Sequence, residues 1–389
     1  MKFELIAEDG QLEPLLHAMQ SAEWIAFDTE FVSEFSYYPE LCLIQMATPG
    51  QLWVIDPMQL TELDAIWTAL CDGDHLTLVH AGREEILFCH RAVSRTPQRW
   101  FDAQLAAGMV GLEYPAAYGT IIFRLLGEKL SKGETRTDWR RRPLTPSQLE
   151  YALNDVLYLQ PVHAKLIQRL DEMQRQDWFD DETQQWQRRL LEVNTKERWR
   201  RVSGSGNLNP RKLAIVRELW QWREAEAQRR NVPAKRVLRD DLIVELARRE
   251  SADPEQIRAI RGMQRRDINQ HVQALARCIS LGQKQRVEKQ RQKPVALPKQ
   301  VDAIAQFLST ALASLCRTRA ISPQIVGTMQ DVKDLVVYHL GLAELEPPKL
   351  VSGWRHDFVG KTLIDAIDGK LSLRIGDPRS EFPISIDET

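Results

Sequence analysis

Two acidic residues follow directly on a short apolar stretch near the start of the chain. Trp24 to Phe27 has the composition of a buried strand, and Asp28 and Glu30 come next. Side chains two residues apart in a strand point to the same face, so the two carboxylates are expected side by side. Like charges this close are costly unless a cation joins them, and hard oxygen ligands suit Mg²⁺ or Mn²⁺. Taken alone, the pair is better explained as two solvated acids at a strand end, because Asp-x-Glu is a common tripeptide.

Strand and helix patterns alternate through the first hundred residues. The hairpin signal Thr48-Pro49-Gly50 separates two apolar strands. The alternation favours an α/β sheet covered by helices, and the quick succession of early strands predicts a mixed sheet whose first part is antiparallel. Strands are predicted at 3–6, 24–27, 41–46, 52–56 and 76–80, and helices at 12–19, 63–70 and 84–92.

Size and composition limit the class of protein. A chain of 389 residues holds two or three domains, and 43% hydrophobic with 27% charged residues is typical of a soluble globular protein. The formal net charge of −2 gives no global argument for nucleic-acid binding. The five cysteines are scattered and form no Cys-x-x-Cys pair, which indicates reduced thiols without a structural zinc site. With no signal-peptide pattern and no membrane-length apolar run, we expect a cytoplasmic protein.

A third acid lies where the strand near residue 80 gives way to a helix. His80-Ala81-Gly82 leads into Glu84 and Glu85. Acids in the first turn of a helix interact favourably with its dipole, and taken alone that explanation is the stronger one. The alternative is that one of these acids faces Asp28 at the carboxyl edge of the sheet, where open α/β sheets bind ligands.

A basic segment with one aromatic residue spans 129–143 and includes Arg136 and Trp139. Basic and stacking side chains are what a single-stranded nucleic acid needs, although a solvated run of charges explains the segment equally well. Whether this segment contacts nucleic acid must therefore be judged from the neighbouring segments of the chain.

The helix after this segment has a clear start. Thr145 suits the N-cap, Pro146 the first helical position and Gln148 a capping box. Tyr151 and Asp155 are four residues apart, so they share one helix face. The hydroxyl and the carboxylate are therefore expected to point to the same place.

The remainder of the chain has helical patterns. Ser203-Gly204-Ser205-Gly206 is a linker signal, and helical bundles are predicted over 207–285 and 300–370. A basic turn near residue 262 includes Arg265, which suits a phosphate contact or a solvated arginine face. Pro378 and Pro383 predict that residues 371–389 form a loose tail.

Taken in order, Asp28-Thr29-Glu30, the acid near residue 85 and Tyr151-x-x-x-Asp155 resemble the three motifs of the tyrosine-type DEDD 3′→5′ exonucleases. The layout is most similar to the ribonuclease D family over about the first 170 residues, and Val232-Pro233 with Asp240-Asp241-Leu242 resembles an HRDC domain. The resemblance implies a ribonuclease H-like mixed-sheet exonuclease domain over 1–202, an HRDC domain over 207–285 and a second HRDC-like helical domain over 300–370.

The resemblance also implies roles for individual residues. The catalytic set would be Asp28, Glu30, Tyr151 and Asp155, and two divalent ions, Mg²⁺ or Mn²⁺, would be held by Asp28, Glu30, Glu85 and Asp155. Tyr151 is expected to orient the attacking water, because a phenol of ordinary pKa near 10 is a poor base at neutral pH. The family usually has aspartate where Glu85 stands, and Glu84 is a competing candidate. The expected substrate-binding residues are Phe31, Arg136, Trp139 and Arg265, with a core position equally suited to Phe31.

The function implied by the resemblance is metal-dependent 3′→5′ exoribonuclease activity. Such an enzyme would release nucleoside 5′-monophosphates from RNA 3′ ends, including tRNA precursors and other structured RNAs, as a monomer without a small-molecule cofactor. One alternative is a DNA 3′→5′ exonuclease of the proofreading or Werner type, because acidic residues alone do not distinguish the sugars. Another is a nucleic-acid-binding protein whose site has decayed through Glu85.

Overall fold

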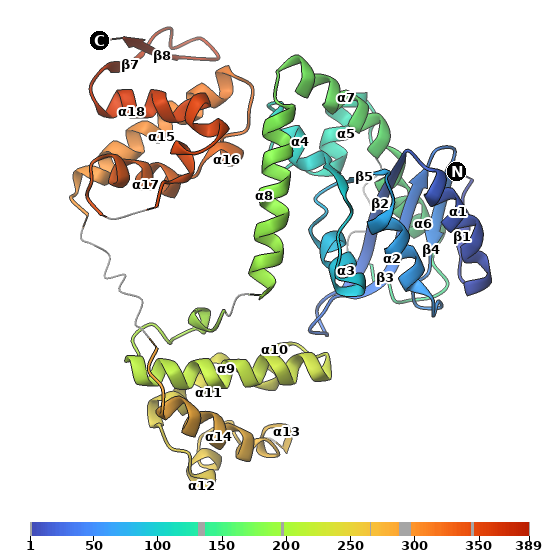
Figure 1. The fold of residues 1–389 in the computed structure, drawn as a ribbon, viewed down its shortest axis with the longest axis vertical. Helices are drawn as coiled ribbons and strands as arrows, with labels where there is room; N and C mark the ends of the chain where they lie inside the picture. Colours follow the sequence, from blue (N-terminus) through green and yellow to red (C-terminus); the bar gives the residue numbers. More distant parts are fainter. Residues whose placement is uncertain are drawn as a thin grey trace.

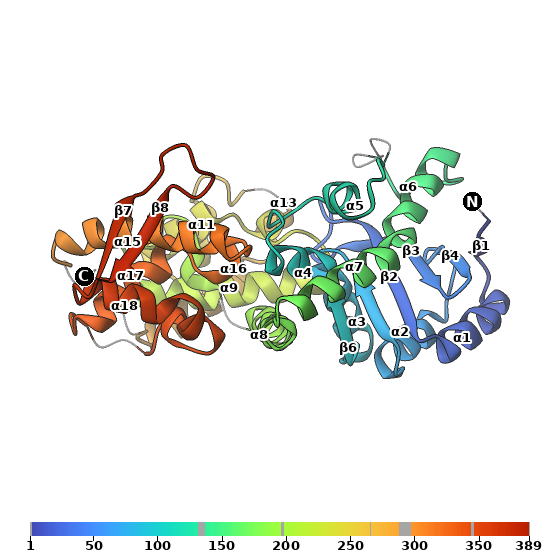
Figure 2. The same cartoon turned by 90° about the horizontal axis from the view of Figure 1, so that it is seen from above.

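The computed structural model describes residues 2–130, 137–195, 198–264, 266–287, 297–343 and 346–388. A sheet-containing N-terminal part, a middle helical bundle and a C-terminal helical bundle are arranged around the long helix α8, Gln176–Thr195 (Figure 1). The N-terminal strand and the C-terminal hairpin lie toward opposite ends of the molecule (Figure 2). Within the described ranges, no helix has the length and apolarity needed to cross a bilayer.

The N-terminal part contains a six-stranded mixed sheet with the order β1-β4-β3-β2-β5-β6. The β3–β4 pair is an antiparallel hairpin that turns between Thr48 and Gln51, as the sequence predicts. β3 is also antiparallel to β2, whereas the β2–β5 and β5–β6 pairs are parallel. The strands are β1 Glu4–Ile6, β2 Trp24–Val32, β3 Glu40–Thr48, β4 Gln51–Ile55, β5 Leu76–Val79 and β6 Arg99–Asp102.

Helices cover both faces of this sheet because the central strands are apolar on both sides. Ile25 and Phe27 of β2 pack on one face against α1 Leu12–Ser21, α2 Leu63–Asp72 and α3 Arg83–Val93. Ala26 points to the other face, where α6 and α7 lie. Since Asp28 and Glu30 continue the alternation of Ala26, they face the α6 side. The helices on that side are α4 Ala103–Met109, α5 Tyr118–Leu126, α6 Pro146–Leu157 and α7 Leu159–Glu172.

The middle bundle has a hydrophobic core of its own, which we call the middle core (Trp199 to Val287). Ser205 is buried and its hydroxyl donates to the carbonyl of Val202 at 2.7 Å, so the expected linker at 203–206 is a packed turn. The elements of the middle bundle are η2 Trp199–Arg201, α9 Pro210–Arg230, α10 Ala234–Val237, α11 Asp240–Arg249, α12 Pro254–Arg258, α13 Arg266–Asn269 and α14 Val272–Gln283.

The C-terminal bundle does not stand apart from the sheet. Its buried side chains join those of α4, α5 and α7 in one cluster, the shared core, which runs from Ala26 to Leu363. Arg175 at the start of α8 crosses this junction, donating to the carbonyls of Met109 and Ala320 at 2.6 Å each. The elements are α15 Gln300–Thr318, α16 Pro323–Val326, α17 Met329–His339, η3 Lys349–Val351, η4 His356–Gly360 and α18 Lys361–Ile367.

The expectation of a loose tail over 371–389 is wrong for most of that segment. β7 Leu371–Ile375 pairs with β8 Ile384–Glu388 as an antiparallel hairpin. Pro378 and Pro383 lie between the paired segments, where they remove no ladder hydrogen bond.

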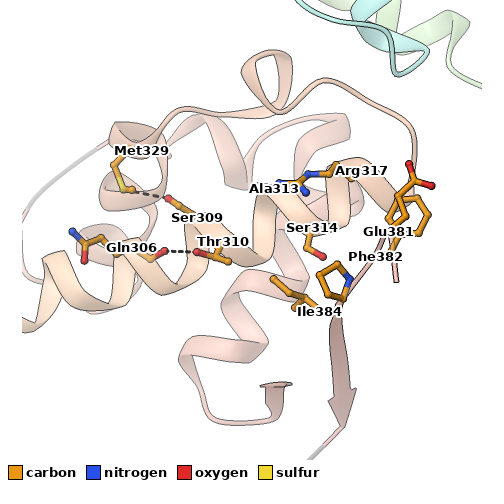
Figure 3. A pocket seen from close by; sticks show the side chains of 11 residues that line it. Gln306, Ser309, Thr310, Ala313, Ser314, Arg317, Met329, Glu381, Phe382 and Ile384 are labelled. Carbon is orange, nitrogen blue, oxygen red and sulfur yellow. Dashed lines mark hydrogen bonds between the residues drawn. The ribbon is translucent and has the colours of Figure 1, made fainter. Parts of the chain in front are cut away.

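A hollow of about 450 Å³ lies between α15 and this hairpin (Figure 3). Two of its hydroxyls have partners, since Ser309 donates to the sulfur of Met329 and Thr310 to the carbonyl of Gln306, both at 3.2 Å. Its charged side chains are Arg317 and Glu381. A single opposite pair of this kind offers no cluster of acids for catalysis.

Candidate active site

Three carboxylates from two elements meet on the α6 side of the sheet. Asp28 and Glu30 come from β2, and Asp155 comes from the last part of α6. One oxygen from each lies within 4.8 Å of the others. The period of two in β2 and the packing of α6 across β2 and β3 together produce this convergence.

The start of α6 is held firmly, and this fixes the residues farther along the helix. Thr145 accepts a hydrogen bond from the backbone of Gln148 while the Gln148 side chain accepts one from the backbone of Thr145, which is the predicted capping box. The same amide donates to Thr137 at 2.9 Å. Farther along α6, Ala152 and Leu153 are buried against β3 and β4.

Burial and mutual repulsion make the three carboxylates hard to ionise. The pKa of Asp28 lies well above its ordinary value because the group is buried and faces Asp155, Glu85 and Glu30. Burial, then the charges of Asp155 and Glu85, raises the pKa of Glu30 to about 8. Burial raises the pKa of Asp155 to about 7, against a hydrogen bond from Tyr151. A site that penalises negative charge in this way is one that a cation would stabilise.

Tyr151 lies one turn before Asp155, and its hydroxyl interacts with that carboxylate closely enough to affect the pKa of both groups. Burial and the charges of Asp155 and Glu30 raise the pKa of the phenol far above its ordinary value. The hydroxyl is therefore a proton donor at neutral pH, placed at the edge of the acidic cluster.

Glu85 lies on the opposite side of β2 from these three acids. It is buried, and the hydroxyl of Thr29 donates to it at 2.6 Å. Burial raises its pKa to about 7, although the Thr29 hydrogen bond opposes the shift. Among the described residues, Glu85 is outside the group of carboxylates that approach within 4.8 Å. Glu84 is ion-paired with Arg83, so Glu85 is the acid of this helix that faces β2.

The expected substrate-binding residues differ in their surroundings. Trp139 is only 4% exposed and packs against Tyr151 with ring centroids 6.1 Å apart, so the structure gives it a packing contact in place of an open stacking face. Phe31 is partly buried and meets Phe88 edge to face at 5.8 Å. Arg136 and Arg265 lie outside the described residues.

Two acids that the sequence patterns did not single out hold the surroundings of the site. Asp102 caps α4 and accepts hydrogen bonds from the backbone of Ala81 and Gly82 at 3.0 and 3.1 Å, which fixes the turn into α3. Asp56 pairs with Arg142, which anchors the segment before α6 to the sheet. Asp56 is the last residue of the predicted strand 52–56, and that position was the available signal for it. No strand was predicted before Asp102, which ends β6 in the structure.

Comparison with known proteins places the chain in a family. A family model described as 3′-5′ exonuclease matches residues 3–171, and a model of the HRDC domain matches residues 212–279. Ribonuclease D of Sphingobium indicum is 30% identical over 386 residues, covering 96% of this chain and 97% of that protein. The chain belongs to the ribonuclease D family.

Other relatives of the family agree with this assignment. Ribonuclease D of Bartonella henselae is 28% identical and covers 95% of this chain and 91% of its own length. The crystal structure of Escherichia coli RNase D matches 95% of this chain and 99% of its own, with a TM-score of 0.77 at 26% identity. As a ribonuclease D, the protein is a 3′→5′ exoribonuclease, and the expected mixed-sheet domain followed by helical HRDC-type structure is confirmed. Family membership favours RNA over the alternative of a DNA exonuclease.

Proposed function

We propose that this ribonuclease D trims the 3′ ends of structured RNAs such as tRNA precursors, releasing nucleoside 5′-monophosphates with the help of two divalent metal ions. The observation that carries the proposal is the convergence of Asp28, Glu30 and Asp155 on one point. The related Escherichia coli RNase D is described as an exoribonuclease involved in structured RNA processing. We further propose that the protein acts as a monomer in the cytoplasm.

The donor set fits hard divalent cations. Three carboxylates whose oxygens lie within 4.8 Å provide the ligands that Mg²⁺ and Mn²⁺ prefer, and their raised pKa values show that they lack a balancing charge. Divalent ions bound here would lower the pKa of a coordinated water and stabilise charge on the attacking and leaving oxygens. Asp28, Glu30 and Asp155 would hold the first ion, with Asp28 also facing the second.

Tyr151 would position the water that attacks the terminal phosphodiester. Its hydroxyl is protonated and lies beside Asp155, so it can donate a hydrogen bond to a water but cannot remove a proton from it. Phe31 would contact the terminal base at the end of β2. Their proximity to the three acids supports these roles.

Glu85 would serve the second ion indirectly. Its carboxylate is held by Thr29 on the far side of β2, yet its charge still raises the pKa values of Asp28 and Glu30. Because glutamate is one methylene longer than the usual aspartate, its carboxylate reaches past the position that an aspartate would take. Replacing Glu85 by aspartate therefore tests whether this family position still takes part; a decayed site predicts that Glu85→Asp gains activity.

A gel assay tests the function directly. RNA and matched DNA, labelled at the 5′ end and carrying a free or blocked 3′ end, are incubated with Mg²⁺, Mn²⁺ or EDTA. We expect a metal-dependent ladder on RNA that is absent with a blocked end and weak on DNA, and no ladder from Asp155→Asn. A tRNA precursor with a 3′ extension then tests the substrate class. Equal or better cleavage of DNA would contradict the proposal, and so would near-native cleavage by Asp155→Asn.

A further inference from the structure

The loop that follows β2 meets the middle bundle directly. Asn231 at the end of α9 accepts hydrogen bonds from the backbone of both Tyr37 and Tyr38, each at 3.2 Å. The Tyr37 hydroxyl donates to Glu224 at 3.1 Å and accepts from Gln228 at 3.2 Å. The α10 end of α9 accordingly lies beside this loop in Figure 1. We call this junction, residues 33–38 with residues 224–236, the seam.

Phe35 is the exposed aromatic side chain at the centre of the seam. It is 47% exposed, although a phenylalanine gains by burial. The guanidinium of Arg140 lies 5.3 Å from its ring centre and that of Arg236 lies 5.5 Å away. One arginine belongs to the segment before α6 and the other to α10, so both structural parts contribute to the same cluster.

Aromatic and basic side chains connect the seam to the active site. Phe31 directly follows Glu30 and contacts Phe88, whose ring lies 4.6 Å from the guanidinium of Arg91. The same guanidinium lies 5.4 Å from the ring of Tyr38, which is 40% exposed. Phe88 itself is buried, so Tyr38 and Arg91 are the exposed groups that a strand leaving the acids would meet on its way to Phe35.

The middle-bundle side of the seam carries unbalanced positive charge. Lys235 and Arg236 are exposed, and among the described residues neither has a carboxylate within ion-pair distance. Both line a small hollow together with Arg239 and Gly262. Exposed aromatic rings interleaved with unpaired basic groups are the combination that single-stranded nucleic acids bind, because rings stack on bases of any sequence and the charges contact phosphates.

The geometry points to a second RNA-binding site at the seam, where a nucleotide upstream of the scissile bond stacks on Phe35 and a phosphate contacts Arg236. Arg140, at the other side of the ring, is already paired with Asp138 at 2.9 Å. This inference rests on the proposed function, since the ligand is the RNA whose 3′ end lies at the acids. It assigns the middle bundle a share in holding the substrate strand. The interaction would be sequence-tolerant and sensitive to salt.

Substrate length tests the site. Only an RNA that extends from the acids to the seam can use Phe35, so we compare a dinucleotide with an oligonucleotide of about a dozen nucleotides. We expect Phe35→Ala to raise KM for the long RNA about tenfold relative to the dinucleotide, and Phe35→Trp to restore it. Phe307→Ala, which removes an exposed ring on α15, should change neither substrate. Arg236→Gln should weaken long-RNA binding and reduce its salt dependence by about one phosphate contact.

Two results would overturn the inference. The first is an equal change in KM for the dinucleotide and the long RNA in Phe35→Ala, which is expected if Phe35 only holds the seam together. The second is an unchanged KM for the long RNA in that variant. If the wild-type protein cleaved neither RNA, the proposed function would fail, but the seam would still be tested by anisotropy of labelled long RNA in EDTA. There, wild-type affinity in Phe35→Ala would refute the site and about tenfold weaker binding would support it.

Discussion

Asp28, Glu30 and Asp155 form a site that the fold assembles at an energetic cost. Burial and mutual charge oppose ionisation of all three, yet β2 and α6 hold them within 4.8 Å. The packing of β2 and α6 into the N-terminal part must therefore offset their repulsion, which is a common arrangement at functional sites. Neutralising one of the three acids, or adding a cation, should reduce the repulsion between them.

Asp28→Asn is expected to stabilise the metal-free protein while abolishing cleavage. Removing one of three repelling charges should raise Tm in EDTA by about 3 °C, corresponding to roughly 1 kcal/mol. Mn²⁺ should raise the Tm of the wild type more than that of the variant, because the variant has lost a ligand. Differential scanning fluorimetry measures both, with exposed Glu62→Gln as control. A wild-type Tm that does not respond to Mn²⁺ would argue against a metal site here.

Tyr151→Phe removes the hydroxyl at the edge of the acids and leaves the ring. We expect kcat on single-stranded RNA to fall about 100-fold with little change in KM, because positioning of the water is lost and RNA contacts remain. Single-turnover cleavage isolates the chemical step. A fall confined to KM would instead assign the hydroxyl to substrate binding.

The residue scale also shows how far the sequence could predict the site. The period of two in β2 places Asp28 and Glu30 together, and helical spacing places Tyr151 beside Asp155. Their meeting across a long sequence separation followed from family resemblance, because local periodicity contains no information on which helix crosses which strand. The position of Glu85 beside Thr29 and the burial of Trp139 depend on tertiary packing and were not predictable.

At the scale of elements, capping determines how well α6 presents its residues. Thr145 caps α6 and Thr328 caps α17 Met329–His339, both through complete capping boxes and both exposed. Only α6 carries site residues. The two caps therefore form a matched pair for separating stability from activity.

Thr145→Ala and Thr328→Ala should each lower the free energy of unfolding by about 1 kcal/mol. We expect only Thr145→Ala to lower kcat, because loosening the first turn of α6 moves Tyr151 and Asp155 relative to β2. Urea denaturation and cleavage of single-stranded RNA measure the two effects. Equal activities in the two variants would show that the first turn does not position the site.

The C-terminal hairpin shows why an element can be missed. Leu371, Leu373 and Ile375 alternate as a strand should, but the two prolines nearby are depleted in strands and favoured a tail. Both prolines lie in the loop between β7 and β8, so they do not interrupt either strand and the hairpin can form.

At the scale of the whole molecule, a buried ion pair fastens the C-terminal bundle to α8. Arg355 donates to Glu182 at 2.5 Å, and both side chains are less than a tenth exposed. Burial opposes the charge on Glu182, but Arg355 outweighs it and holds the pKa of the carboxyl below its ordinary value of 4.5. The pair therefore stabilises the fold above about pH 4.5 and is lost as the pH falls through the lowered pKa.

Glu182→Gln should lower the free energy of unfolding by about 3 kcal/mol at neutral pH, because Arg355 then stays buried without a counter-charge. The difference from the wild type should shrink as the pH falls below about 4.5, where the wild-type carboxyl itself becomes protonated. Denaturation at a series of pH values measures it, with exposed Glu346→Gln as control. If the difference in unfolding free energy between the variant and the wild type did not depend on pH, it would result from altered packing and not from the loss of the charge.

The two cores predict which pieces of the chain fold alone. The middle core lies within residues 198–287, so that fragment should unfold cooperatively in isolation. Residues 1–195 should instead expose the apolar faces of α4 and α7 and bind the dye ANS, because the C-terminal bundle completes the shared core. A cooperative, ANS-negative 1–195 fragment would contradict this.

The division of the shared core has an evolutionary consequence. The first and last thirds of the chain behave as one host, and the middle bundle behaves as a guest inserted into it. Relatives could lose, duplicate or exchange the guest and keep a sound host, whereas loss of the C-terminal third would leave the host unfinished. Recombination should therefore be tolerated at the two ends of the guest and selected against at the junction crossed by Arg175.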